Sequence, residues 1–189
     1  MFQERDSYET SLSGPLGLAT LTLQASEIQI RKATIDDFPQ MWEIFHPIVQ
    51  KGDTYVFLPE TTYAQAKDYY WSNQGYFNFV AVLDNTIVGM YTIKANQPGL
   101  GSHVANASYM VHPDHQGKGI GSLMAADSIK NATALGFKAM QFNMVVSTNT
   151  QAVNAWKKMG FAIVGTLPKV FNHQTLGYVD AYVMYRSLE

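Results

Sequence analysis

The sequence predicts one α/β domain built on a mixed, mostly antiparallel sheet that is flanked by helices. Short runs rich in β-branched and aromatic residues alternate along the 189-residue chain with segments of helical periodicity. Residues typical of helix caps and tight turns separate these segments. Interleaved strands and helices without an internal repeat are typical of an α/β fold with a single core.

The first predicted elements are a strand and a helix. The segment Ile28–Thr34 alternates apolar and polar residues, as a half-buried strand does. Thr34 is followed three residues later by Asp37, which is an N-cap signature for a helix over residues 35–50. Pro47 should bend or end that helix because it lacks a backbone N–H and its ring crowds the preceding turn.

A second helix and a hairpin follow. Thr62 with Gln65 is another capping signature, and it opens a helix that we expect to close at Gly75. Two β-rich runs then flank Asp84 and Asn85, a pair that favours the tight turn of a β-hairpin.

The second half repeats this alternation, with helices that end at Gly136 and Gly160. The expected strands are 104–111, 137–146, 161–166 and 178–188, and the expected helices are 121–135 and 149–159. Residues 1–26 are interpreted as an N-terminal extension with one extra strand at Leu18–Leu23, and residues 27–189 as the domain.

Composition excludes several classes of function. The chain has 13 Lys and Arg against 15 Asp and Glu, a balance that argues against nucleic-acid and anionic-membrane partners. It has no cysteine, so disulfides, thiolate metal sites and a cysteine nucleophile are excluded. We found no metal-ligand spacing, no membrane-length apolar run and no secretory signal. The expectation is a cytoplasmic protein without a metal.

The most informative motif is "QGKGIG", in which Gln116, Gly119 and Gly121 give the spacing Q-x-x-G-x-G. It follows a predicted strand and opens a predicted helix. The spacing fits neither a dinucleotide fingerprint nor a P-loop. Glycines at such a junction expose backbone N–H groups at the positive end of a helix, where a pyrophosphate can bind. A plain tight turn is the alternative interpretation.

A second motif, "NTQAVNAWKKMGF" from Asn149 to Phe161, follows about thirty residues later. With "VHP" and "QGKGIG" before it, this segment resembles the GNAT superfamily of N-acetyltransferases, over roughly Ile28 to Arg186. The resemblance implies a single GNAT-type domain that uses acetyl-CoA as co-substrate. The cofactor-binding residues that it implies are Tyr109, Met110, Val111, Gln116, Gly117, Lys118, Gly119, Ile120, Gly121, Ser122, Asn149 and Trp156.

The segments "HVANASYMV" and "FNMVVSTN", and the tail from Gly165, are similar to the fungal azetidine-2-carboxylate acetyltransferases, which N-acetylate a proline analogue. The important asparagines of that family correspond to Asn106, Asn143 and Asn149. A looser similarity to the phosphinothricin and amino-acid acetylases runs through "TYVFLPETTYAQAKDYYW".

The resemblance also implies a catalytic arrangement. It assigns the oxyanion donor to a backbone N–H at Tyr109, where the strand has parted from its neighbour. Asn106 and Asn143 would hold the carboxylate and amine of an amino acid, although strand asparagines often only satisfy nearby backbone groups. Strand parity predicts that Gln141, Asn143, Val145 and Ser147 share one face, opposite Met140, Phe142 and Met144.

Neither the proton acceptor nor the proton donor of the reaction is evident. His112, Asp114 and His115 lie beside the glycine motif, but a free α-amine with a pKa of about 8 does not need a dedicated base. Trp156 stands where many family members have a tyrosine, and it either packs the pantetheine arm or anchors its helix in the core. The aromatic segment Tyr69–Trp71 either roofs the acceptor pocket or belongs to the core.

These observations predict an N-acetyltransferase that moves an acetyl group directly from acetyl-CoA to the amine of a small molecule, an amino acid or its analogue. A peptide or protein N-terminus as acceptor and a non-catalytic acyl-CoA sensor are the alternatives. Exposed strand edges make a homodimer a reasonable expectation.

Overall fold

The computed structural model describes residues 28–189. The predicted N-terminal extension and its strand at Leu18–Leu23 lie outside the described residues. The strands are β1 (Gln29–Lys32), β2 (Phe77–Leu83), β3 (Thr86–Ala95), β4 (Val104–Val111), β5 (Ala139–Val146), β6 (Ala162–His173) and β7 (Gly177–Ser187). The α-helices are α1 (Phe38–Gln50), α2 (Tyr63–Trp71), α3 (Ile120–Ala134) and α4 (Thr150–Lys158), and short 3-10 turns lie at Ile35–Asp37, Gly99–Gly101 and Pro113–His115.

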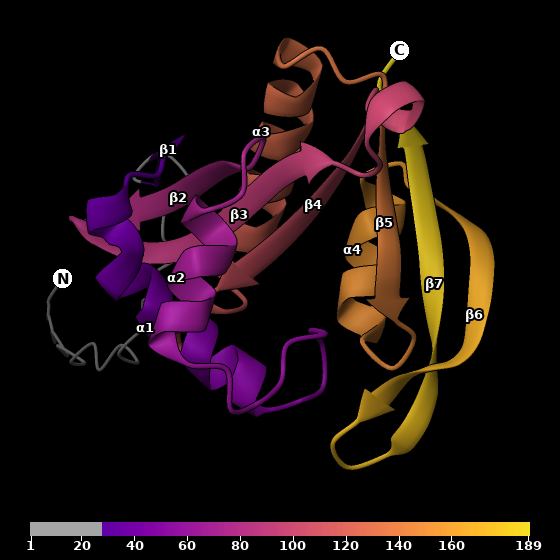
Figure 1. The fold of residues 1–189 in the computed structure, drawn as a ribbon, viewed down its shortest axis with the longest axis horizontal. Coiled ribbons are helices and arrows are strands. Elements are labelled where there is room, and N and C mark those ends of the chain that lie inside the picture. The colour runs from indigo at the N-terminus through magenta and orange to yellow at the C-terminus, as the bar shows by residue number, and fades with distance from the viewer. Residues whose placement is uncertain (1–27) are drawn as a thin grey trace, which may run out of the picture.

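The described strands form one seven-stranded sheet in the order β1-β2-β3-β4-β5-β7-β6 (Figure 1). The β4–β5 pair is parallel and the other neighbours are antiparallel. The predicted α/β class with a mixed, mostly antiparallel sheet is therefore confirmed.

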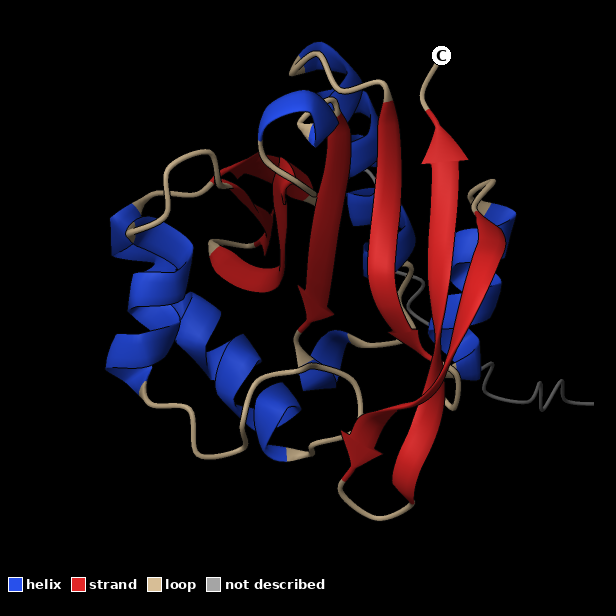
Figure 2. Ribbon diagram, turned by 45° about the vertical axis from the view of Figure 1, so that its right-hand side comes forward, coloured by secondary structure: helices blue, strands red, loops and turns tan. Residues whose placement is uncertain are grey.

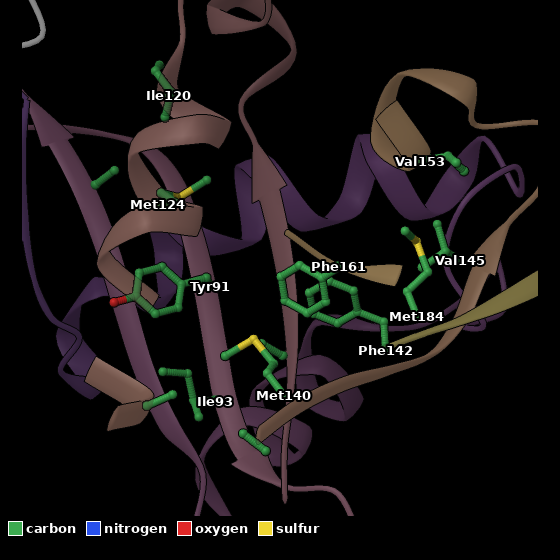
Figure 3. Packing of buried hydrophobic residues seen from close by; sticks show 14 of the residues in the cluster. Tyr91, Ile93, Ile120, Met124, Met140, Phe142, Val145, Val153, Phe161 and Met184 are labelled. Atoms are coloured by element: carbon green, nitrogen blue, oxygen red, sulfur yellow. The ribbon is translucent and has the colours of Figure 1, made fainter. Parts of the chain in front are cut away.

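Helices cover both faces of the sheet (Figure 2). On one face, α1 and α2 pack over Val80, Met90 and Met110. On the other face, α3 and α4 pack over a larger cluster. In Figure 3, Tyr91, Met124, Met140, Phe142, Phe161 and Met184 lie together in this second cluster. Each face thus has its own apolar core, and the sheet separates the two.

Local sequence signals placed several elements correctly. Both predicted capping boxes form, from Thr34 with Asp37 and from Thr62 with Gln65. The hairpin turn between β2 and β3 places Asp84 at φ 49° and Asn85 at φ 63°. Positive φ at both central residues is what a tight hairpin turn of the primed type requires.

The first helix runs through Pro47 and ends at Gln50, the last residue of the predicted helix. The end of the second helix differs from expectation. The second helix stops at Trp71, where Ser72 caps it by donating its backbone N–H to the carbonyl of Asp68, so the prediction of an end at Gly75 was wrong. Gly75 instead has a φ of 82° in the loop that leads to β2.

The last two strands form a long hairpin, and β6 extends well past the expected end at residue 166. It continues through Pro168 and Lys169, the latter at φ 50°. The register with β7 shifts between Leu167 and Phe171. Since β6 lies at the edge of the sheet, a proline and a bulge are tolerated there without a lost partner on the outer side.

The predicted parity of β5 is wrong beyond Asn143. The register with β7 shifts between Phe142 and Val145, so the strand has a bulge at that point. The extra residue turns Val145 back into the same core cluster as Phe142. Asn143 and Gln141 remain together on the opposite face, where their side chains are hydrogen-bonded.

The strands β4 and β5 part soon after they begin. Their ladder consists of the pairs Val104–Ala139 and Ala105–Met140, and from there the two strands diverge (Figure 1). The opening between them leaves one edge of β4 without a strand partner in the described residues. This opening positions the candidate site.

Candidate active site

A groove with a volume of about 1330 Å³ runs through the opening between β4 and β5. One end, the glycine end, is lined by the glycine turn Gln116–Gly121 and by α4. The other end, the carboxamide end, is lined by polar side chains from β3, β4 and β5, by Tyr69 of α2 and by the loop 51–57. Of the predicted site residues, all line this groove except Lys118, which is exposed.

The glycine turn exposes a run of backbone donors. Gly117 and Gly119 have φ values of 75° and 82°, which L side chains rarely adopt, and a Cβ added to either would meet nothing within 4 Å. Gly119 is the N-cap of α3. Within the described residues, five consecutive backbone N–H groups have no hydrogen-bond partner, those of Gly117, Lys118, Gly119, Ile120 and Gly121. Together with the helix dipole, they make an anion cradle.

A buried polar atom lies beside this cradle. The Nδ1 atom of His115 is the buried side-chain nitrogen or oxygen that lacks a partner within residues 28–189. Burial, and then the charge of Lys118, lower the pKa of His115. The Nδ1 atom of His112 accepts a hydrogen bond from the Asp114 N–H, 3.2 Å away. In the described residues, neither histidine is hydrogen-bonded to a polar side chain of β3, β4 or β5.

The peptide group of Tyr109 faces the opening between the strands. His112 donates its backbone N–H to Val88 of β3, so by the alternation of an antiparallel ladder the N–H and carbonyl of Tyr109 point toward β5. The hydroxyl of Tyr55, from the loop after α1, donates to the Tyr109 carbonyl. Burial raises the pKa of Tyr55, so its hydroxyl stays protonated. The expected position of the Tyr109 N–H, beside a parted strand, agrees with this geometry.

The side chain of Tyr109 lies on the face of the sheet that α3 and α4 cover. Its hydroxyl lies 2.7 Å from Ser128 Oγ, and its ring is 4.8 Å from the ring of Trp156. Trp156 also packs 4.6 Å from Phe142. It therefore lines the groove and packs against the core at the same time, and its contact with a pantetheine arm stays a prediction.

Asn149 caps α4. Its Oδ1 atom accepts from the backbone N–H of Ala152 at 3.1 Å. The cap occupies this oxygen, whereas the Nδ2 group is the part of the side chain that remains available at the groove wall.

The carboxamide cluster consists of Asn96, Asn106, Asn143 and Gln141. Asn106 Nδ2 and Asn143 Nδ2 both donate to Asn96 Oδ1, at 3.2 and 2.7 Å. Gln141 Nε2 donates to Asn143 Oδ1 at 2.8 Å. The two predicted asparagines are thus joined through a third that follows β3.

A contact between two distant segments lies at the tip of the β6–β7 hairpin, past the C-terminal end of β5. The backbone N–H of Gln174, at the tip of the β6–β7 hairpin, donates to the carbonyl of Gly52 at 2.9 Å. Gly52 has a φ of 57°, in the left-handed region that favours glycine. Of the aromatic segment Tyr69–Trp71, which lies in α2, Tyr69 lines the groove, whereas Tyr70 is buried among the helices.

The groove residues that sequence reasoning missed include Tyr55, Lys94 and Asn96. A polar residue recurs at every second position in "TIKAN", which places Lys94 and Asn96 on one face with Thr92. That alternation was a usable signal. Tyr55 contacts a carbonyl 54 residues away, and no local pattern indicates this contact.

A model of the acetyltransferase (GNAT) family matches residues 38–161, which is more than half of the chain. The chain belongs to the GNAT acetyltransferase family. Membership places it among the acyltransferases, as its two motifs predicted. None of the helices in the described part is long and apolar enough to cross a membrane, and no group of three or more metal-ligating side chains gathers there.

Several relatives agree with this assignment. The N-acetyltransferase aca1 of Schizosaccharomyces pombe is 36% identical over 101 residues, or 52% of this chain and 47% of aca1. The chain thus matches about half the length of that relative. The L-amino acid N-acetyltransferase AaaT of Escherichia coli is 28% identical over 85% of this chain and 98% of its own. A GCN5-related N-acetyltransferase from Kribbella flavida has a TM-score of 0.81 and 41% identity, over 86% of this chain and 98% of its own. The resemblance to azetidine-2-carboxylate acetyltransferases stays a prediction.

Proposed function

We propose that this GNAT protein transfers an acetyl group from acetyl-CoA to the amine of an amino acid or a close analogue, directly and within a ternary complex. The observation that carries the proposal is the meeting of two features in one groove. An anion cradle of free backbone N–H groups lies at one end, and a cluster of neutral carboxamides lies at the other.

The glycine end fits acetyl-CoA as donor. The free N–H groups suit a pyrophosphate, and the space above Gly117 and Gly119 is open. The unpaired edge of β4 offers backbone groups to an extended arm such as pantetheine. When bound, acetyl-CoA would supply the thioester whose carbonyl the amine attacks.

The residues near the opening would perform the chemistry. The Tyr109 N–H would stabilise the oxyanion, since a preorganised backbone donor gains strength where water is excluded. Asn106 and Asn143 would orient the amine and the group beside it. The acceptor would attack as its neutral amine. The proton left on its nitrogen would then pass to water, and CoA would leave as a thiolate, whose conjugate thiol has a pKa of about 8.5. The carboxamides both donate and accept hydrogen bonds, which suits the carboxylate and the amine of an amino acid.

The choice of acceptor is supported by a relative. AaaT, by its name an L-amino acid N-acetyltransferase, supports an amino acid over a peptide or protein N-terminus.

The test is a thiol-release assay with acetyl-CoA and a panel of amines, with product identified by mass spectrometry. The panel holds the common amino acids, azetidine-2-carboxylate, simple amines and a peptide with a free N-terminus. We expect N-acetylated product from one or more amino acids or analogues and at least tenfold less from the peptide. Faster acetylation of the peptide would replace the acceptor assignment, and binding of acetyl-CoA without any amine-dependent release would favour a sensor.

A homodimer is part of the proposal. Within residues 28–189 the outer edge of β6 has no strand partner, and Val164 and Tyr178 are 60% and 70% exposed on the same hairpin. Light scattering of the purified protein would test it.

A further inference from the structure

We propose that Lys94 binds an anionic group of the acceptor, so that the enzyme selects amines that carry a free carboxylate. This inference rests on the proposed function and adds the feature by which the acceptor is recognised. It is argued from the surroundings of one ammonium group at the carboxamide end.

Lys94 is a half-buried cation held in a fixed place. Its Nζ donates to the hydroxyl of Tyr76 at 2.8 Å and lies 4.6 Å from the centre of the Tyr76 ring and 5.5 Å from that of Tyr69. Contacts of this kind stabilise a cation without neutralising it. Burial by itself acts to lower the pKa of Lys94, but the hydrogen bond and proximity to the two tyrosines raise it overall, so the group stays charged.

The charge of Lys94 has no carboxylate partner in the described residues. The ion pairs there involve Arg31, His112 and Lys138, and none includes Lys94. Asp53 is the one acidic residue among those lining the groove, and its Oδ1 accepts from the hydroxyl of Thr54. A partly desolvated ammonium in a groove favours an anionic ligand, because the opposite charge compensates for the hydration that the ammonium has lost.

The phosphates of a donor at the glycine turn cannot be that ligand. Lys94 pairs with Asn106 across the β3–β4 ladder, whereas the turn follows Val111 at the far end of β4. At a strand rise of about 3.3 Å per residue, the five residues between them span about 16 Å. The Tyr109 peptide lies three residues from Asn106, about 10 Å along the strand. A lysine side chain and one amino acid together span that distance.

The neighbouring carboxamides complete an amino-acid subsite. Asn96 lies two residues after Lys94, on the same face of β3. Within residues 28–189, its Nδ2 group and the Oδ1 atom of Asn106 have no hydrogen-bond partner. The first is a donor suited to a carboxylate oxygen, and the second is an acceptor suited to an amine N–H. The subsite therefore offers a cation and a donor for one group and an acceptor for the other.

The test compares acids with matched compounds that lack the charge. The probes are azetidine-2-carboxylate, its carboxamide and azetidine, and L-leucine, L-leucinamide and isoamylamine. For the wild type we expect kcat/KM at least tenfold higher for the acid than for the amide, in whichever of the two series the enzyme acetylates.

Lys94→Met, which keeps an apolar stem of similar length, should lower kcat/KM for the acid by about 10- to 100-fold, through KM, since one charge-assisted contact is lost. In the same variant, kcat/KM for the amide and the KM for acetyl-CoA should stay within twofold of wild type. Lys94→Arg should keep most of the wild-type preference for the acid over the amide.

Equal use of acid and amide by the wild type would overturn this inference and leave the N-acetyltransferase intact. A Lys94→Met variant that lost the same factor in kcat/KM for the acid and for the amide would overturn it as well. If no probe is acetylated, the proposed function fails and this inference with it. Thermal unfolding of each variant shows whether it is folded, and the acid-to-amide ratio of the wild type does not depend on any variant.

Discussion

The two ends of the groove are built by different means. The glycine turn takes its binding groups from the backbone of one short segment, Gln116–Gly121, and needs nothing from the rest of the chain except the start of α3. The carboxamide end takes side chains from three strands, and its members make contacts across as many as 47 residues. One end is a local motif, and the other exists only once the sheet has formed.

This difference has a functional meaning. Point substitution leaves the donor groups of a backbone cradle unchanged in kind, because every residue type except proline presents the same N–H. A cluster of side chains can be altered one residue at a time. The glycine end therefore suits a ligand that all relatives share, and the carboxamide end suits the ligand that distinguishes them. The variants below test whether the two ends can be changed separately.

The largest effect is expected at the glycine end. Gly121→Glu would place a negative side chain at the groove wall beside the cradle, so acetyl-CoA affinity should fall by about 100-fold or more through charge repulsion and lost contacts. Gly121→Ala is the matched control, since its Cβ would meet only Val111 Cγ2 at an ordinary 3.8 Å. Isothermal titration calorimetry measures the affinity of both variants for acetyl-CoA. Unchanged affinity in a folded Gly121→Glu variant would show that the glycine turn does not bind the pyrophosphate.

The next effect separates the two ends by kinetics. Asn143→Ala removes one member of the carboxamide cluster and should lower kcat/KM for the acceptor by roughly 10-fold, with the KM for acetyl-CoA unchanged. Asn149→Ser keeps a cap for α4 but loses the Nδ2 donor, so it should mainly raise the KM for acetyl-CoA. If both variants had the same kinetic defect for the same substrate, the assignment of Asn143 to the acceptor and Asn149 to acetyl-CoA would be wrong.

A smaller effect is expected at Trp156, which lies between the ends. Indole N–H donates hydrogen bonds but does not release its proton in this pH range. Trp156→Phe should therefore retain kcat within about fivefold, with the basic limb of the pH–rate profile in place. Trp156→Ala should instead lower stability by about 3 to 5 kcal/mol, because it empties a site packed against Tyr109 and Phe142. A hundredfold loss of kcat in a folded Trp156→Phe enzyme would give the indole a direct part in the chemistry.

The smallest effect lies outside the groove. The Arg31 guanidinium, 2.7 Å from the carboxylate, lowers the pKa of Asp37 to about 2. A carboxylate with a depressed folded pKa stabilises the protein above its unfolded pKa, near 3.8, and loses that contribution as the pH falls toward 2. Both side chains are partly solvated, so Asp37→Asn should cost only about 0.5 kcal/mol at pH 7.

Denaturant unfolding at several pH values measures this contribution. The difference between wild type and Asp37→Asn should shrink below pH 4, while kcat and both KM values stay unchanged. Asp36→Asn, at an exposed neighbouring position, is the control. If the difference in unfolding free energy between wild type and Asp37→Asn grew as the pH fell, it would contradict a lowered pKa of Asp37 in the folded protein.

Local features were predictable because the residues that cause them are adjacent. Both capping boxes, the Asp84–Asn85 turn and the glycine turn follow from side chains or glycines within a few positions of one another. The end of α2 was missed because Ser72 rather than the more distant Gly75 closes it. The bulge in β5 was missed because it arises from the pairing with β7, which the sequence of β5 alone does not contain.

The candidate site divides in the same way. Asn106 and Asn143 were identified through a resemblance, but the residue that joins them, Asn96, was not. Its role depends on the β3–β4 ladder and on the course of β5, since it accepts from both strands at once. The contact of Gly52 with Gln174 likewise depends on the whole fold.

The most direct test of the central claim is a calorimetric titration of acetyl-CoA into the Asn106→Ala/Asn143→Ala double variant. If the glycine end is complete without the carboxamide end, the dissociation constant should stay within about twofold of wild type while amine-dependent turnover is lost. A tenfold or greater loss of acetyl-CoA affinity in the folded double variant would show that the two ends form one site, and would contradict the account.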